Sequence, residues 1–101
     1  MAKTSAGMVK DLADAPLHGV TIGGKHILVA RVGKNYLAMG NICTHDGCWL
    51  SGGKLEGSTV RCPCHGSVFN VKTGEAVHGP AEKPEPVFRV TVENGELFIE
   101  V

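Results

Sequence analysis

The sequence predicts a small all-β domain of antiparallel strands, and three features of its 101 residues support that prediction. Short runs of β-branched and aromatic residues recur along the chain. Glycines, 14 in all, separate these runs at close intervals, and helical periodicity is weak throughout. Many short strands joined by frequent turns are typical of a sandwich or a barrel. The length favours one domain over residues 1–101.

The expected strands cover residues 18–22, 25–32, 36–39, 87–92 and 96–101. Gly23-Gly24 is a hairpin turn signal, and Glu93-Asn94-Gly95 turns the chain into a closing hairpin. Residues 9–15 allow one helical turn, which Pro16 ends. The run GPAEKPEP at 79–86 carries three prolines, so it is predicted to be a stiff loop rather than a central strand.

Charge and composition narrow the function classes. Ten basic and ten acidic residues cancel, and only 5% of residues are aromatic. The composition therefore shows neither the charge excess nor the aromatic content that would indicate nucleic acid binding. The N-terminus lacks the apolar run of a signal peptide, and no stretch approaches the roughly 18 apolar residues of a membrane anchor. We therefore expect a soluble cytoplasmic protein, in which four cysteines more often indicate metal or redox chemistry than a disulfide framework.

Two short stretches concentrate the soft donor atoms. CTHDGC covers residues 43–48 and CPCHGS covers residues 62–67, and each offers two sulfurs and one imidazole. Both stretches are predicted to be loops, where a β-scaffold can bring ligands together. Thiolate and imidazole suit zinc, copper or an iron–sulfur cluster. Two such segments rarely coexist without a metal, so the sequence predicts a metal site.

Spacing alone does not choose between the metals. The two stretches contain the patterns Cys43-x-His45 and Cys62-x-x-His65. A zinc site built from Cys43, Cys48, Cys62 and His65 also satisfies the usual ligand count. At this point both zinc and iron–sulfur chemistry stay open.

The pattern Cys-x-His, sixteen residues, then Cys-x-x-His resembles the ligand motif of the Rieske family, and the resemblance extends over essentially the whole chain. It implies a Rieske fold, a small antiparallel sandwich with a cluster-binding subdomain formed by the two loops. It also implies one 2Fe–2S cluster per chain. Carried over residue by residue, Cys43 and Cys62 would bind one iron, and His45 and His65 the other.

The resemblance also implies roles for neighbouring residues. In the Rieske subunits of quinol-oxidising cytochrome bc complexes, cysteines at the positions of Cys48 and Cys64 form a disulfide. A pair of reduced thiols is the alternative in a reducing compartment, and burial of the bond would slow its reduction. Ser67 stands where that family places a hydroxyl that tunes the cluster potential, whereas Phe69 replaces a hydrogen-bonding tyrosine.

Three departures separate the chain from the bc-complex subunits. We expect no N-terminal membrane anchor, Asp46 stands where quinol-oxidising members present an apolar residue, and Phe69 is the third departure. We therefore expect an electron carrier, not an enzyme, between a flavoprotein reductase and a terminal oxidoreductase such as an oxygenase. The alternatives are a zinc-stapled interaction module and a small subunit of a larger reductase.

The remaining aromatic and imidazole side chains lie outside the motif. Trp49, next to Cys48, is predicted to pack in the core. His18, His26 and His78 are predicted to be exposed to solvent.

Overall fold

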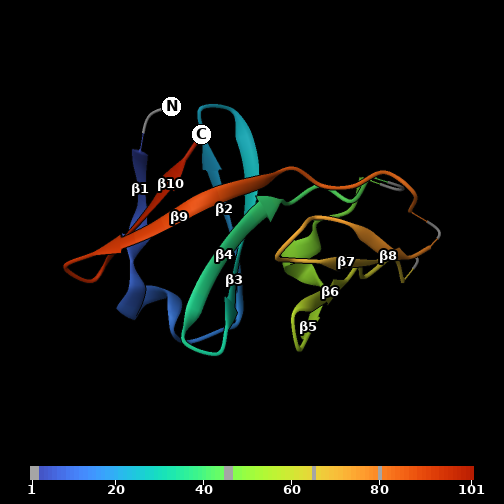
Figure 1. Ribbon diagram of the computed structural model, residues 1–101, viewed down its shortest axis with the longest axis horizontal. Helices are drawn as coiled ribbons and strands as arrows, with labels where there is room; N and C mark the ends of the chain where they lie inside the picture. The colour runs from blue at the N-terminus through green and yellow to red at the C-terminus, as the bar shows by residue number, and fades with distance from the viewer. Residues whose placement is uncertain (1–2, 45–46, 65, 80) are drawn as a thin grey trace.

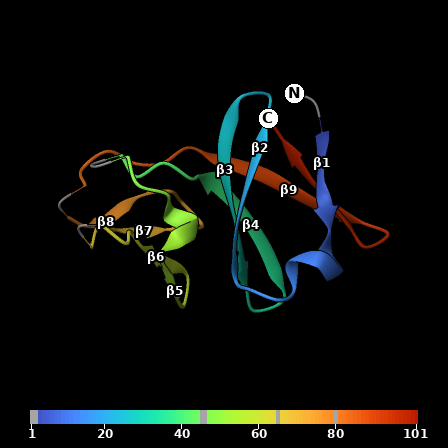
Figure 2. The same cartoon turned by 180° about the vertical axis from the view of Figure 1, so that it is seen from behind.

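Two antiparallel sheets account for the described part of the chain. The computed structural model describes residues 3–44, 47–64, 66–79 and 81–101. The larger sheet has the order β1-β10-β9-β4-β3-β2, and the smaller has the order β5-β6-β7-β8. In Figure 1 the smaller sheet lies beside the larger one, on the side away from β1 and β10, and Figure 2 shows the same arrangement from behind.

Most strands pair with a neighbour in sequence, whereas β1 pairs with β10 and β4 pairs with β9. The larger sheet contains β1 (Lys3–Met8), β2 (Leu17–Ile22), β3 (Lys25–Val32), β4 (Asn35–Gly40), β9 (Val87–Glu93) and β10 (Glu96–Glu100). The smaller sheet contains β5 (Lys54–Glu56), β6 (Thr59–Arg61), β7 (Val68–Asn70) and β8 (Ala76–His78). Two short 3-10 helices are η1 (Val9–Leu12) and η2 (Leu50–Gly52). No helix in the described ranges is long and apolar enough to cross a bilayer.

Strand β3 separates two hydrophobic cores. Because alternate side chains of a strand point to opposite faces, Ile27 and Val29 join the core that contains Leu97 and Ile99 of β10. Leu28 and Ala30 join the core that faces the smaller sheet. Residues 27–30 are at most 1% exposed, since both faces of this strand are covered.

The second core is the one that reaches the two predicted ligand loops. It combines Leu28 of β3 with Val60 of β6 and Phe69 of β7, and it also contains Cys43 and Cys62. The predicted ligand loops are therefore anchored in the same packed interior that joins the two sheets.

The strands predicted from sequence are all present, within one or two residues of their predicted ends. The prediction missed β1 and the whole smaller sheet. β1 has the sequence KTSAGM, without a β-branched run, and it is held by pairing with β10 across an irregularity between Ser5 and Gly7. Each strand of the smaller sheet has only three residues, too few to show periodicity.

The proline-rich segment 79–86 forms no strand in its described residues, as predicted. It follows β8 and runs back along the molecule to β9, as the orange ribbon in Figure 1 shows. Its backbone is fixed near its end, because the Glu85 N–H donates to the Gly74 carbonyl at 2.8 Å and the Gly40 N–H donates to the Pro86 carbonyl at 2.9 Å. This segment thereby connects the smaller sheet with the end of β4.

Candidate metal centre

Each ligand loop joins two chain segments that pair antiparallel at its base. The loop at 43–48 follows β4, and an antiparallel bridge between Ile42 and Trp49 closes its base. The loop at 62–67 connects β6 to β7, which pair with each other. His45, Asp46 and His65 lie outside the described residues.

The two loops have matching backbone hydrogen bonds. In the first, the Cys43 N–H donates to the Cys48 carbonyl at 2.8 Å, and the Gly47 N–H donates to the Cys43 carbonyl at 2.9 Å. In the second, the Cys62 N–H donates to the Ser67 carbonyl at 2.7 Å. The Gly66 N–H donates to the Cys62 carbonyl at 3.3 Å. The similarity between CTHDGC and CPCHGS therefore reflects one loop geometry used twice.

Glycine is required at the fifth position of each loop. Gly47 has a φ of 75° and Gly66 has a φ of 78°. This is the left-handed region, which side chains with a Cβ adopt only at a cost. The turn at the glycine brings the sixth residue back beside the first, so each loop begins and ends at the same edge of the core.

The first residue of each loop is a buried thiol. Cys43 and Cys62 are each 2% exposed, lie in the same core cluster and are not in a disulfide. Thiolates are the ligands that hold iron–sulfur clusters. Two sulfur donors from paired loops, shielded from water by one core, therefore fit the thiolate side of such a cluster.

The remaining two cysteines are joined to each other. A disulfide links Cys48 to Cys64, with their Cα atoms 6.5 Å apart, and ties the first loop to the second. The zinc set considered from the sequence needs Cys48 as a thiolate, so this bond removes that set. Burial does not protect the bond as expected, because Cys64 is exposed and Cys48 is half-buried.

Ser67 is buried and has one hydrogen-bond partner from the proline-rich segment. It is fully buried, and its Oγ accepts the backbone N–H of Ala81 at 3.0 Å. Because the oxygen is the acceptor in this bond, the hydroxyl proton is available for a second partner. Phe69, also fully buried, packs in the core and offers no hydroxyl.

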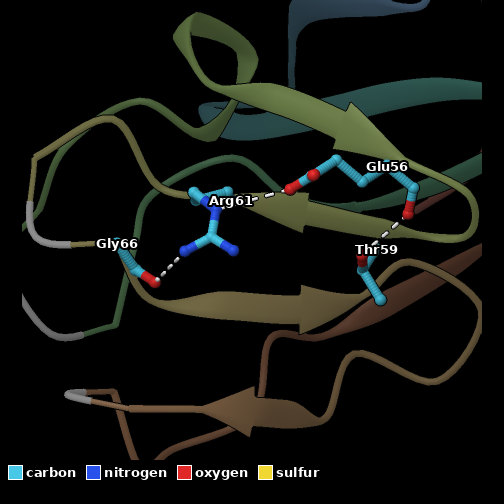
Figure 3. Close-up of polar contacts among 4 residues, drawn as sticks. All are labelled: Glu56, Thr59, Arg61 and Gly66. Atoms are coloured by element: carbon cyan, nitrogen blue, oxygen red, sulfur yellow. Dashed lines mark hydrogen bonds and ion pairs between the residues drawn. The ribbon is translucent and has the colours of Figure 1, made fainter.

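An arginine that sequence reasoning did not single out supports the second loop. Figure 3 shows the Arg61 side chain between Glu56 and Gly66. Its Nε lies 3.4 Å from Glu56 Oε1, and its Nη1 donates to the Gly66 carbonyl at 3.4 Å. Thr59 Oγ1 donates to the Glu56 carbonyl at 2.8 Å and closes the β5–β6 turn. Arg61 therefore adds a positive charge and a donor next to Cys62.

Trp49 and His18 contradict their predicted environments. Trp49 is 49% exposed, not packed in the core, and its ring meets His26 edge-on with 4.8 Å between centroids. The bridge to Ile42 turns both apolar side chains outward at the base of the first loop. His18 is half-buried, and its Nε2 lies 3.0 Å from the carbonyls of Leu12 and Ala15. His26 and His78 are exposed as predicted.

Glu85 is the other functional candidate that sequence reasoning missed. It is only 5% exposed, and burial raises its pKa from 4.5 to about 7, an effect that a backbone hydrogen bond from Thr44 partly opposes. An acidic residue between two prolines of a polar loop has the sequence signature of a solvated side chain. Nothing in the one-dimensional pattern indicates that the loop folds it inward.

Comparison with known proteins gives consistent matches. The Rieske [2Fe-2S] domain family matches residues 3–93. Ferredoxin CarAc of Metapseudomonas resinovorans is 40% identical over 78 residues, which cover 77% of this chain and 73% of that protein. The ferredoxin component of the naphthalene 1,2-dioxygenase system of Pseudomonas putida is 32% identical over 93 residues, covering 92% and 89%.

Solved structures show the same fold. A chain in the complex of reduced oxygenase and oxidized ferredoxin in carbazole 1,9a-dioxygenase has a TM-score of 0.89 and 34% identity to this protein, covering 96% of this chain and all of that chain. The expected all-β Rieske fold is thereby confirmed. The buried thiols and paired loops fit the cofactor of the matched family, a 2Fe–2S cluster of the Rieske type. The chain belongs to the Rieske 2Fe-2S domain family.

Proposed function

We propose that the protein carries one electron at a time from a flavoprotein reductase to a terminal oxygenase. The observation that supports this most directly is the pair of matching loops, each of which buries one thiol in a shared core. Relatives that match over most of the chain are ferredoxin components of dioxygenase systems, which are electron carriers rather than catalysts. The same relatives favour this role over that of a reductase small subunit.

In this proposal the ligands are those expected from the sequence. Cys43 and Cys62 hold one iron, and His45 and His65 hold the other. When bound, the cluster supplies a one-electron couple at a potential between about −150 and +300 mV, because neutral imidazoles leave it less negative than a four-thiolate cluster. The core around Cys43 and Cys62 keeps water away from their sulfur atoms. The disulfide between Cys48 and Cys64 keeps the two loops together.

The hydroxyl of Ser67 has a separate task. Its oxygen is anchored by the Ala81 N–H, so its proton can be donated toward a cluster sulfur. A donor to sulfur favours the reduced form, which carries one more negative charge.

In the proposal, residues 1–101 work as one domain located in the cytoplasm, and cell fractionation tests the location.

The ligand assignment is tested by composition and spectroscopy of purified variants. The wild-type protein is expected to be red-brown, with iron and sulfide in equal amounts and a Rieske-type electron paramagnetic resonance signal when reduced. His65→Ala is expected to abolish that signal, whereas His78→Ala, at an exposed histidine of β8, is the matched control and should retain it. A colourless wild-type protein containing zinc would refute the proposal.

The electron-transfer role is tested separately by reconstitution. A flavoprotein reductase and a terminal oxygenase from a related dioxygenase system are mixed with the purified protein and reduced nicotinamide cofactor. Product formation should depend on the protein, and the His65→Ala variant should not replace it. Rapid reduction by the reductase without any transfer to an oxygenase would show that the terminal partner is assigned wrongly.

A further inference from the structure

Glu85 is the least satisfied buried polar residue of the described chain. Three polar residues are buried there, namely Asn41, Ser67 and Glu85. The Asn41 amide exchanges two hydrogen bonds with Ser51, and Ser67 accepts one from Ala81. Glu85, by contrast, has a buried Oε2 without a hydrogen-bond partner among the described residues. A carboxyl oxygen in such a position raises the free energy of the folded state, so the contacts that hold this side chain inside are of interest.

The backbone around Glu85 holds the side chain in place from two sides. Its own N–H is bonded to the Gly74 carbonyl, and the carbonyl of the next residue, Pro86, is bonded to the Gly40 N–H. The carboxyl group lies against the last residue of β4, where a Cβ on Gly40 would overlap Glu85 Oε1. The carboxyl is therefore directed at the point where β4 leads into the first ligand loop.

The same segment holds that loop through Thr44. The Thr44 backbone N–H donates to the Glu85 carboxyl. The Thr44 Oγ1 donates to the Lys83 carbonyl at 2.7 Å. Thr44 stands between the proposed ligands Cys43 and His45. Two hydrogen bonds that Thr44 donates, to Lys83 and to Glu85, thus fix the direction in which the chain leaves Cys43.

We propose that Glu85 is a positioning residue of the cluster site, whose carboxyl orients the first ligand loop through Thr44. The proposal rests on the proposed cluster function. The Glu85 carboxyl offers an acceptor oxygen to the Thr44 N–H in its ionised and in its protonated form. Groups that orient metal ligands in this way typically change metal retention by about 10- to 100-fold when they are removed.

The central experiment replaces Glu85 by leucine in the cluster-loaded protein. Glu85→Leu removes the acceptor and is expected to speed cluster loss to a chelator by about tenfold or more. It should also shift the electron paramagnetic resonance spectrum and the reduction potential. In hydrogen-exchange mass spectrometry, a peptide that contains Thr44 should exchange faster. Glu85→Gln, which keeps an acceptor oxygen, should restore most of each property.

Two controls separate positioning from general destabilisation. Glu82→Ala removes an exposed carboxyl of the same loop and should behave as wild type. Ile99→Val weakens the other core, at a fully buried position. It should lower thermal stability but leave the spectrum and the potential unchanged. Should Glu85→Leu fail to fold, Glu85→Ala decides, because it removes the same acceptor without placing a branched apolar side chain against Gly40, and it should give changes of the same kind.

The outcomes distinguish this inference from the proposed function. A wild-type protein without a cluster would overturn the proposed function and the inference with it. A wild-type protein with a Rieske spectrum, together with a Glu85→Leu variant of unchanged spectrum, potential and cluster lifetime, would overturn the inference alone. It would also be overturned if Glu85→Leu changed only thermal stability, as Ile99→Val should.

Discussion

Ser67 illustrates how a single buried hydroxyl serves two groups at once. Its oxygen accepts the Ala81 N–H inside a fully buried site, so it links the second ligand loop to the proline-rich segment. Its proton is left for another acceptor. A residue in this position affects both the packing of the loop and the charge balance of the site.

Ser67→Ala is therefore expected to change two measured quantities. The free energy of unfolding should fall by about 1–3 kcal/mol, because the buried Ala81 N–H loses its acceptor. The reduction potential should also fall, because a donor to the proposed cluster is lost. Voltammetry and thermal unfolding measure the two effects, with Ser5→Ala of the exposed edge strand β1 as the control. An unchanged potential would show that the hydroxyl does not face the cluster.

Glu85 should make stability depend on pH. Its pKa is raised from 4.5 to about 7, so the carboxyl is protonated in the folded and the unfolded state below 4.5 and ionised in both above 7. The folded protein bears the cost of the buried charge only at the higher pH. Stability should therefore fall by about 3 kcal/mol as pH rises through this window, at about 1.4 kcal/mol per pKa unit.

The matched variant for this test is Glu85→Gln, which does not titrate. The difference in unfolding free energy between wild type and variant is measured below pH 4.5 and above pH 7. Wild type should lose stability relative to the variant across that interval. A difference that is constant with pH would contradict the prediction.

At the scale of elements, the two ligand loops form one unit. Each loop is closed by its own backbone hydrogen bonds, and the disulfide between Cys48 and Cys64 joins the two. The bond also encloses β5, η2 and β6, which lie between its two cysteines in the chain. It restricts the unfolded chain as well as the relative position of the loops.

Cys64→Ser is expected to leave the cluster bound but to lower its stability. Opening this loop of the chain should cost about 3 kcal/mol on the chain-entropy model. The visible spectrum should persist at ordinary temperature, while the thermal midpoint and the potential fall. Because Cys64 is exposed, treating wild type with a thiol reductant should reproduce the loss of stability. Complete loss of iron in the variant would show that Cys64 is itself a ligand.

The sequence predicted some elements well and others not at all, for physical reasons. The β-branched run of β3 and the turn after β9 carry strong local signals, so those strands were predicted within a residue or two. The three-residue strands of the smaller sheet exist because hairpin pairing holds them around the core. Such long-range support leaves no periodic pattern in the sequence.

In the site, too, features with a local sequence signal could be predicted and features that depend on long-range contacts could not. The ligand loops were predicted because their donor atoms are adjacent in sequence. Trp49 was placed wrongly, because its direction depends on the bridge to Ile42, which sequence spacing does not reveal. Glu85 and Arg61 act on the ligand loops through contacts that only the folded chain creates.

At the scale of the whole molecule, the ligand loops lie at one end and most of the larger sheet lies at the other. The structure measures 39 × 26 × 18 Å along its principal axes. The first and last strands pair with each other in the larger sheet, and the ligand loops lie at the smaller sheet (Figure 1). Exposed apolar side chains occur at both ends, including Ile42 and Trp49 at the base of the first loop and Val92 on β9.

Trp49 is expected to contact the redox partner, since it is a large exposed aromatic side chain at the base of the first ligand loop. Trp49→Ala should raise the KM of the terminal oxygenase for this protein several-fold, while the reduction potential stays the same. Val92→Ala, at a position of similar exposure (48%) in the larger sheet, is the control and should leave the KM unchanged. Equal effects of the two variants would argue against docking at the first loop.

The double-sided burial of β3 has a consequence for protein engineering. Ile27 and Val29 touch only the core shared with β10, whereas Leu28 and Ala30 touch the core that holds the two thiols. Side chains on opposite faces of this eight-residue strand belong to different core clusters, so each face can be repacked against its own set of neighbours. A designer can prolong the shelf life of the protein through the odd-numbered residues and leave the even-numbered ones, and with them its electrochemistry, untouched.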